Sequence, residues 1–235
     1  EMVLAAATAE KQGAFHIRSL GIREPLVLGE VETTVQVVLA PGAEGEARVT
    51  ISSLRDPGAG NENAGEEGEP AWTLHAEATV QWQEARAPRA LPSIESALES
   101  TIEVAIARFG KVEEGVDTYA RFEEKLGLHY GPTFRGVQRL YMGEDDALGL
   151  VELPASSDAL TEYLMHPALL DACLHVLSGV SGTSETALPV AFSGVHLYHT
   201  LPARVWSEVH LKRGAKGARS WECQILIRDE AGELL

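Results

Sequence analysis

The stretch His166–Gly179, with the sequence HPALLDACLHVLSG, decides the fold. Pro167 suits the first position of a helix, where its missing N–H costs nothing, and the residues that follow are apolar except for Asp171 and His175. A helix that is apolar on most sides must be enclosed by other elements, and a sheet wrapped around it is the economical solution. We therefore expect a largely buried helix that carries one carboxylate and one imidazole.

Asp171 and His175 stand at positions i and i+4, so their side chains share one face of this helix. In one interpretation the two groups satisfy each other and only fix the helix, because an unpaired buried carboxylate is expensive. In the other, Asp171 lines a pocket and serves as a general acid, while His175 holds and orients it. The spacing alone leaves both interpretations open.

The rest of the chain predicts a helix and a set of antiparallel strands in each half, which is an α+β fold. In the first half we expect a helix at 1–13, an extended segment at 15–28, strands at 31–40, 47–54 and 71–82, and an exposed Gly- and Glu-rich loop at 56–70. In the second half we expect a short helix at 116–127 that ends at Gly127, and strands at 134–143, 147–154, 188–199, 203–213 and 220–229. A Pro-containing linker precedes this half, and 94–110 has no clear pattern.

The composition and charge of the chain disfavour several classes of function. The chain has 235 residues with 45% hydrophobic and 23% charged residues, and its formal net charge of −16 disfavours nucleic acid as a partner. No apolar run approaches the ~20 residues of a membrane helix. Cys173 and Cys223 are the only cysteines, which favours a reducing, cytoplasmic setting, and no Cys/His cluster has zinc-ligand spacing.

A second segment, YGPTFRG at Tyr130–Gly136, combines a tight turn with aromatic residues. Gly131 and Pro132 force the turn, and Phe134 and Gly136 follow at alternate positions. Taken alone, the segment is typical of the start of a strand with an aromatic core residue.

Together, YGPTFRG and the later HPALLDACLH resemble the Y-G-P-x-F-x-G and H-P-x-x-L-D-x-x-x-[Q/H] segments of the dehydratase domains of modular polyketide synthases. The segment LPVAFSGVHLY, from Leu188, resembles the family's L-P-F-x-W-x-G-V segment, with Val190 and Phe192 in place of two aromatic residues. The opening EMVLAAA and the later PLVL are similar to the family's first helix and following strand. The resemblance covers essentially the whole chain.

This resemblance implies a double hot-dog fold, in which two antiparallel sheets each wrap around a central helix. On that basis we expect an N-terminal hot-dog at 1–84, a linker at 85–116 and a C-terminal hot-dog at 117–235. Members of the family remove water from a 3-hydroxyacyl thioester on an acyl carrier protein and form an α,β-unsaturated thioester. A double-bond isomerase, a cyclase and a non-catalytic scaffold domain are the alternatives on the same fold.

The resemblance also implies the site. Asp171 is expected to be the catalytic acid, His175 to hydrogen-bond it and Tyr130 to position the substrate hydroxyl or the carboxyl group. Expected substrate-binding residues, taken from the matched segments, are Gly131, Pro132, Phe134, Gly136, His166, Pro167, Leu170, Leu188, Pro189, Val190 and Phe192. No intrinsic cofactor or metal is expected. The phosphopantetheine arm of the carrier protein delivers the substrate, and neighbouring synthase domains and a second copy in a homodimer are the further partners.

One expected element is missing from the sequence. The family's catalytic base is a histidine in an H-x-x-x-G-x-x-x-x-P segment just before the first helix, and none of the eight histidines of this chain has that spacing. The start at Glu1 and the abrupt end suggest a piece of a longer polypeptide. For residues 1–235 alone we therefore expect little or no dehydratase activity.

Overall fold

The computed structural model describes residues 1–11, 13–29, 32–43, 45–54, 71–82, 101–155, 162–181, 188–212 and 220–235. The chain divides into two compact units. The N-terminal unit takes in Met2–Ala87 and Leu188–Leu197, and the C-terminal unit takes in Glu1, Pro88–Ala187 and Tyr198–Leu235.

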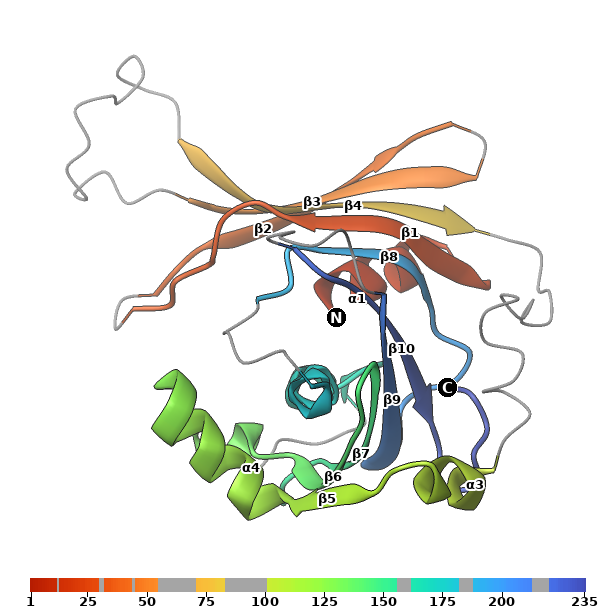
Figure 1. The fold of residues 1–235 in the computed structure, drawn as a ribbon. Coiled ribbons are helices and arrows are strands. Elements are labelled where there is room, and N and C mark those ends of the chain that lie inside the picture. The colour runs from red at the N-terminus through yellow and green to blue at the C-terminus, as the bar shows by residue number, and fades with distance from the viewer. Residues whose placement is uncertain are drawn as a thin grey trace. The chain divides into compact units, whose positions relative to one another are not determined.

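The N-terminal unit is an antiparallel five-stranded sheet with one helix on its face (Figure 1). Its strands are β1 (Phe15–Ile22), β2 (Val35–Pro41), β3 (Glu46–Leu54), β4 (Trp72–Trp82) and β8 (Ala191–His196), in the order β2-β3-β4-β1-β8. Helix α1 (Met2–Glu10) contacts β2, and its buried residues are Val3, Leu4 and Ala7. On β3 the buried Ala47 and Val49 alternate with outward residues, which is the period of a half-buried strand.

The C-terminal unit repeats this plan with more helical elements. Its strands are β5 (Lys111–Glu114), β6 (Val137–Met142), β7 (Asp146–Glu152), β9 (Arg204–Lys212) and β10 (Glu222–Arg228), in the antiparallel order β10-β9-β7-β6-β5. Its helices are α3 (Ile102–Ala107), α4 (Gly115–Arg121) with the π-turn η1 (Phe122–Leu126), and α5 (Pro167–His175) with the 3₁₀ turn η4 (Val176–Gly179). The 3₁₀ turn η2 (Pro132–Phe134) precedes β6. Gly127 ends the α4–η1 helix with φ +66°, as the sequence predicts.

Helix α5, drawn in teal in Figure 1, is the enclosed helix that the sequence predicts. It contacts β6 and β7, and the turn η4 that follows it contacts β9. Leu169, Ala172, Cys173 and Val176 are 0% exposed. The helix can lie this close to the sheet because a Cβ at Gly136 would stand 2.7 Å from the Cβ of Ala172, so only glycine fits there.

The unit boundaries differ from the sequence expectation in two places. Strand β8 does not belong with 117–235; it pairs with β1 in the N-terminal sheet, with Ile17 opposite Val195 and Leu20 opposite Phe192. The alternating pattern of a strand shows which face is buried but not which neighbour it pairs with. Residues 101–116 are not a linker either, because they form α3, β5 and the first residues of α4 in the C-terminal unit. The expected loop at 56–70 and most of the linker, 85–100, lie outside the described residues.

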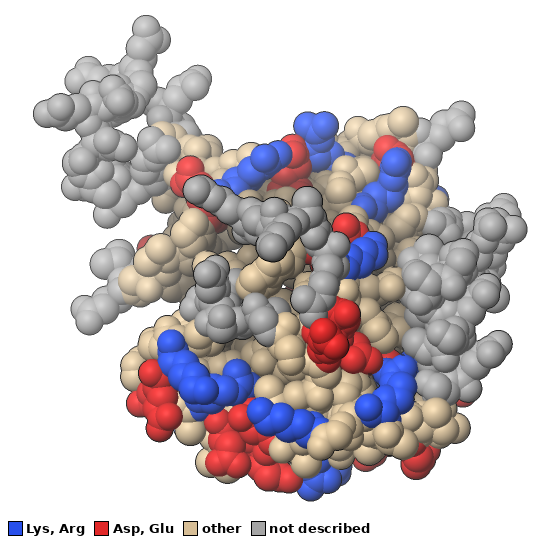
Figure 2. Space-filling model, in the orientation of Figure 1, with Lys and Arg blue, Asp and Glu red and all other residues tan. Residues whose placement is uncertain are grey.

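The surface carries both signs of charge. On the face shown in Figure 2, Lys and Arg side chains stand among Asp and Glu side chains. Exposed ion pairs such as Lys212–Glu222 at 2.6 Å and Arg139–Glu114 at 3.2 Å contribute little to stability. Across the described residues, no helix has the length and hydrophobicity that crossing a lipid bilayer requires.

Candidate active site

The start of α5 is built by His166 and Pro167. The Nδ1 atom of His166 accepts a hydrogen bond from the Ala168 backbone N–H at 3.2 Å, so the side chain caps the helix. The His166 ring is 7% exposed and meets the ring of Tyr163 edge-on, with centroids 4.8 Å apart. His166 and Pro167 thus fix where the helix begins, and with it the direction in which its later residues point.

Asp171 and His175 differ sharply in exposure. The Asp171 side chain is 39% exposed, whereas that of His175 is only 7% exposed. Asp171 Oδ2 lies 3.1 Å from His175 Nε2, within ion-pair distance, but the oxygen lies off the N–H direction and no well-aligned hydrogen bond forms. The helix therefore holds a buried imidazole against a carboxylate that reaches the surface. Asp171 is not sealed inside the core.

Three aromatic rings enclose His175. Tyr130 lies closest, with ring centroids 4.4 Å apart, and Phe122 and Tyr119 follow at 5.6 and 5.8 Å. Burial, together with the negative charge of Asp171, raises the pKa of Tyr130 above its ordinary value. Tyr130 therefore keeps its proton and remains a hydrogen-bond donor in the neighbourhood of the carboxylate.

The Tyr130–Gly136 segment is a closed turn against α5. Gly131 precedes the η2 turn, and the Arg135 side chain donates a hydrogen bond from Nε to the Tyr130 carbonyl at 2.8 Å. Turn η2 contacts α5, and Phe134 remains 43% exposed. The turn thus places the Tyr130 ring against the helix and leaves Phe134 on the surface beside it.

The structure brings together only part of the residue set expected from the sequence. Asp171, His175 and Tyr130 form one cluster, with the Tyr130–Gly136 turn and Leu170 on the same helix–turn surface. Leu188, Pro189, Val190 and Phe192 lie in the N-terminal unit, where Leu188 is 79% and Val190 is 66% exposed.

Two residues of the cluster were missed by sequence reasoning. Tyr119 and Phe122 come from the helix predicted at 116–127, on which they stand three positions apart and so share a face. That spacing was the available signal. Their contact with His175 depends on how α4 packs against α5, which no local pattern gives.

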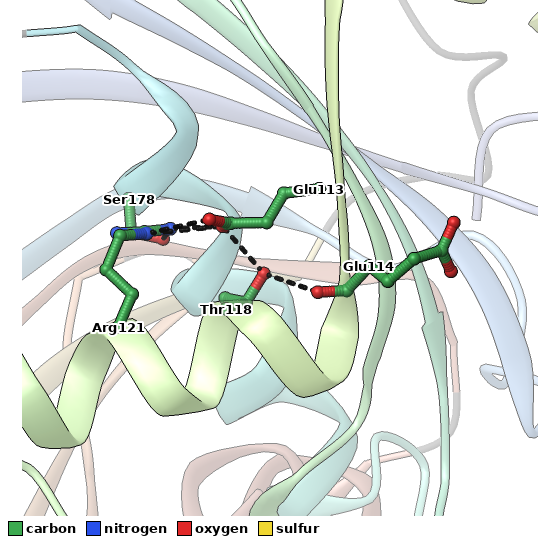
Figure 3. Close-up of polar contacts among 5 residues, drawn as sticks. All are labelled: Glu113, Glu114, Thr118, Arg121 and Ser178. Atoms are coloured by element: carbon green, nitrogen blue, oxygen red, sulfur yellow. Dashed lines mark hydrogen bonds and ion pairs between the residues drawn. The ribbon is translucent and has the colours of Figure 1, made fainter.

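A polar cluster shown in Figure 3 holds α4 in place. Arg121 donates hydrogen bonds from Nε and Nη2 to the Glu113 carboxylate, the shortest at 2.8 Å, and one from Nη2 to Ser178 Oγ at 3.3 Å. Thr118 Oγ1 donates to Glu113 Oε2 at 3.0 Å. We call Glu113, Thr118, Arg121 and Ser178 the α4 latch, because they tie α4 to β5 and to η4, the turn that directly follows α5.

The charge at the centre of the α4 latch is the Glu113 carboxylate. Burial acts to raise its pKa, but the hydrogen bonds and positive charge of Arg121 and the hydrogen bond of Thr118 outweigh burial and lower it. Glu113 therefore stays ionised and holds Arg121 at neutral pH.

A separate pocket of about 370 Å³ opens on the C-terminal unit. Its lining residues are Glu114, Gly115, Val116, Tyr119, Arg135, Val137 and Gln138. Tyr119 is the one residue that it shares with the rings around His175, and Asp171 is not in its lining. Within the described ranges, no three His, Cys, Asp or Glu side chains gather as metal ligands.

The amino-acid sequence is similar to polyketide synthase proteins. A family model described as polyketide synthase dehydratase N-terminal domain matches residues 99–235, more than half of the chain. The spectinabilin polyketide synthase system protein NorA of Streptomyces orinoci is 37% identical over 196 residues, which cover 82% of this chain and 9% of that protein. Polyketide synthase GfsB of Streptomyces halstedii is 34% identical over 209 residues, which cover 84% of this chain and 3% of that protein. The chain thus spans less than a tenth of the length of these relatives.

Solved structures match over nearly the whole chain. The dehydratase domain from the CurF module of the curacin polyketide synthase superposes with a TM-score of 0.80 at 25% identity, covering 100% of this chain and 78% of that one. An inactive mutant of the CurK dehydratase, with histidine replaced by phenylalanine, superposes with a TM-score of 0.76 at 25% identity, covering 98% and 75%. The two helix-bearing sheets are those of the double hot-dog fold, and the chain belongs to the polyketide synthase dehydratase family.

Proposed function

We propose that this chain is the part of a dehydratase that carries the general acid. The substrate is a 3-hydroxyacyl thioester on an acyl carrier protein, and the product is the α,β-unsaturated thioester. The observation that carries the proposal is the position of Asp171, a carboxylate 39% exposed on a largely buried helix and 3.1 Å from a buried imidazole. A merely structural ion pair has no need to hold one partner at the surface.

In the proposed step, a base removes the proton from the α-carbon, and the electrons of that C–H bond form the double bond. The C–O bond to the β-carbon breaks as the Asp171 carboxyl group gives its proton to the departing hydroxyl, which leaves as water. Hydroxide is a poor leaving group, so this proton transfer is the acid's contribution. Afterwards the protonated base and the Asp171 carboxylate return to their starting states by exchange with solvent.

The proposed step also needs a base. The expected base is a histidine in an H-x-x-x-G-x-x-x-x-P segment, and residues 1–235 contain no such segment. The CurK dehydratase mutant, in which a histidine is replaced, is described as inactive, which supports a need for histidine in this family. We infer that the chain as given shows little or no dehydration by itself.

Neighbouring residues have supporting roles in this proposal. His175 orients Asp171, and Tyr130, which keeps its proton, directs its hydroxyl toward the substrate oxygen or the carboxyl group. In the C-terminal unit, Phe134 and Leu170 are proposed to contact the acyl chain, together with the other residues of the YGPTFRG and HPALLDACLH segments. In the N-terminal unit, the proposed substrate-binding residues are Leu188, Pro189, Val190 and Phe192. The chemistry is proton transfer, which the side chains and substrate perform without a bound group. The carrier protein, neighbouring synthase domains and a second copy of the chain are the proposed partners.

The direct test is an elimination assay on a 3-hydroxyacyl carrier protein, with the loss of water followed by mass spectrometry. Two proteins are compared: residues 1–235, and the product of the native gene with whatever residues precede Glu1, which we call the extended form. We expect elimination by the extended form and little or none by the shorter one. Asp171→Asn in the extended form is expected to lower turnover by about 100-fold or more while circular dichroism stays unchanged.

The outcomes separate the alternatives. Elimination by residues 1–235 alone would contradict the expected need for a histidine segment. An extended form that folds and contains such a segment, yet removes no water, would contradict the dehydratase proposal. Appearance of a β,γ-unsaturated product from the α,β-unsaturated thioester in deuterated buffer would favour an isomerase. If no histidine segment precedes Glu1 in the gene, a scaffold role is favoured.

A further inference from the structure

The Tyr119 hydroxyl joins three parts of the C-terminal unit. It comes from α4, accepts a hydrogen bond from the Val137 backbone N–H at the start of β6 at 3.0 Å, and lies 3.3 Å from His175 Nδ1 on α5. Tyr119 is 5% exposed, so these contacts are made largely inside the protein. Tyr119 is therefore the link through which α4 reaches the imidazole beside Asp171.

The direction of the bond to His175 follows from the hydrogen-bonding capacity of a phenol, which has one hydrogen to donate and an oxygen that accepts. The Val137 backbone N–H directs its hydrogen at the Tyr119 oxygen. Burial, opposed only in part by this hydrogen bond, raises the pKa of Tyr119 far above its ordinary value, so the phenol keeps its hydrogen. While the oxygen accepts from Val137, the phenol hydrogen is left to donate, and His175 Nδ1 lies 3.3 Å away as its acceptor.

A neutral imidazole that accepts at Nδ1 carries its own hydrogen on Nε2. His175 Nε2 is buried and has no aligned acceptor, and the carboxylate within reach is Asp171, with Oδ2 at 3.1 Å. A hydrogen on Nε2 therefore lies on the side of the ring nearest Asp171 Oδ2, although the oxygen stands off the N–H direction.

We propose that Tyr119 is a positioning residue that fixes His175 in the Nε2–H tautomer, so that the imidazole presents an N–H, and not a lone pair, on the side where Asp171 Oδ2 lies 3.1 Å away. The consequence for the general acid rests on the proposed function of Asp171, whereas the tautomer of His175 does not. The α4 latch supports this arrangement, because Arg121 binds both Glu113 and Ser178 and so ties the helix that carries Tyr119 to the turn after α5.

The first experiment measures the tautomer directly, by ¹⁵N NMR of histidine-labelled residues 1–235 at neutral pH. The His175 signals are assigned by their loss in His175→Gln. We expect the Nε2–H tautomer in the unchanged chain, and a shift toward the Nδ1–H tautomer in Tyr119→Phe, which removes only the donated hydrogen and the acceptor oxygen. Tyr130→Phe is the matched control, because the Tyr130 ring contacts the same imidazole but no hydrogen bond joins the two side chains. In this control the tautomer of His175 should be unchanged.

The proposal is overturned if His175 carries its hydrogen on Nδ1 in the unchanged chain. It is also overturned if the tautomer of His175 is the same in Tyr119→Phe as in the unchanged chain. The measurement on the unchanged chain decides the question even if Tyr119→Phe does not fold. It also needs no turnover, so a failure of the dehydratase proposal would not be mistaken for a failure of this one.

The second experiment uses the extended form of the elimination assay, after that assay has shown turnover. A positioning residue for the acid is expected to act on the chemical step, so Tyr119→Phe should lower kcat by about 10-fold with KM little changed, short of the full loss of a general acid. A change confined to KM would contradict the proposal, because it would indicate a role in substrate binding.

Discussion

At the scale of single residues, the two polar groups of α5 are stabilised in different ways. Asp171 remains partly in contact with solvent, so it loses only part of its hydration. His175 is buried, and its Nδ1 is satisfied by Tyr119 while three aromatic rings pack around it. A buried polar group is tolerated when its hydrogen bonds are replaced, and His175 meets this condition on its Tyr119 side.

A substitution pair at His175 tests this account. His175→Leu keeps an apolar body but leaves the buried Tyr119 hydroxyl without its acceptor, which we expect to lower the free energy of unfolding by about 1–3 kcal/mol. His175→Gln is the matched control, since its side-chain oxygen can accept from Tyr119 and its amide can donate to Asp171. Urea denaturation of both variants gives the comparison. Equal stability of the two variants would show that the Tyr119–His175 hydrogen bond contributes nothing.

At the scale of elements, the site depends on how closely α5 and the Tyr130–Gly136 turn approach each other. Gly136 packs against Ala172, the residue that follows Asp171 on α5. The space that a side chain at Gly136 would need is filled by the Ala172 side chain and by the Glu152 carbonyl oxygen. A well-packed contact of this kind cannot take up an added methyl group without moving the helix or the turn. The last glycine of the YGPTFRG segment is thus explained by packing.

The prediction at this scale compares two glycines of the same turn. Gly136→Ala would place a Cβ 2.7 Å from that of Ala172, and we expect a loss of about 1–3 kcal/mol in the free energy of unfolding. Gly131→Ala meets nothing within 4 Å and has φ −69°, which alanine adopts freely. Its stability should be unchanged or rise by up to about 1 kcal/mol. Thermal or urea unfolding checks both, and a neutral Gly136→Ala would contradict the close packing.

At the scale of the whole molecule, the sequence predicts the features of the fold that depend on local sequence patterns. The buried α5, the helix end at Gly127 and the α+β class all follow from periodicity and turn chemistry, and two complete motifs identify the family and its fold. The pairing of β8 with β1 does not follow, because an alternating pattern fits any free sheet edge. The α4 latch and Tyr119 were missed for a related reason: their partners are distant in the sequence, and each residue alone is an ordinary helix residue.

The stability of the two units is expected to change in different pH ranges. In the C-terminal unit, hydrogen bonds and opposite charges outweigh burial and lower the pKa values of Glu113 and Glu208, so the stability that these groups add is lost only in acid. In the N-terminal unit, His16 on β1 and His196 on β8 stand opposite each other, with rings stacked at 4.7 Å. Burial lowers the pKa of both, and the charge of His196 adds to this effect at His16.

A histidine with a lowered pKa in the folded state binds its proton more readily when the chain unfolds. The N-terminal unit should therefore have its full stability above the ordinary histidine value of 6.5 and lose stability as the pH falls below it, down to the folded-state values. Hydrogen exchange from pH 7.5 to 5.5, corrected for intrinsic rates, should show protection falling at β1 and β8 and not at β6 and β7. His196→Gln should flatten this dependence, because it removes one titrating ring and its charge beside His16. If β1 loses protection equally in that variant, the stacked pair is not the cause.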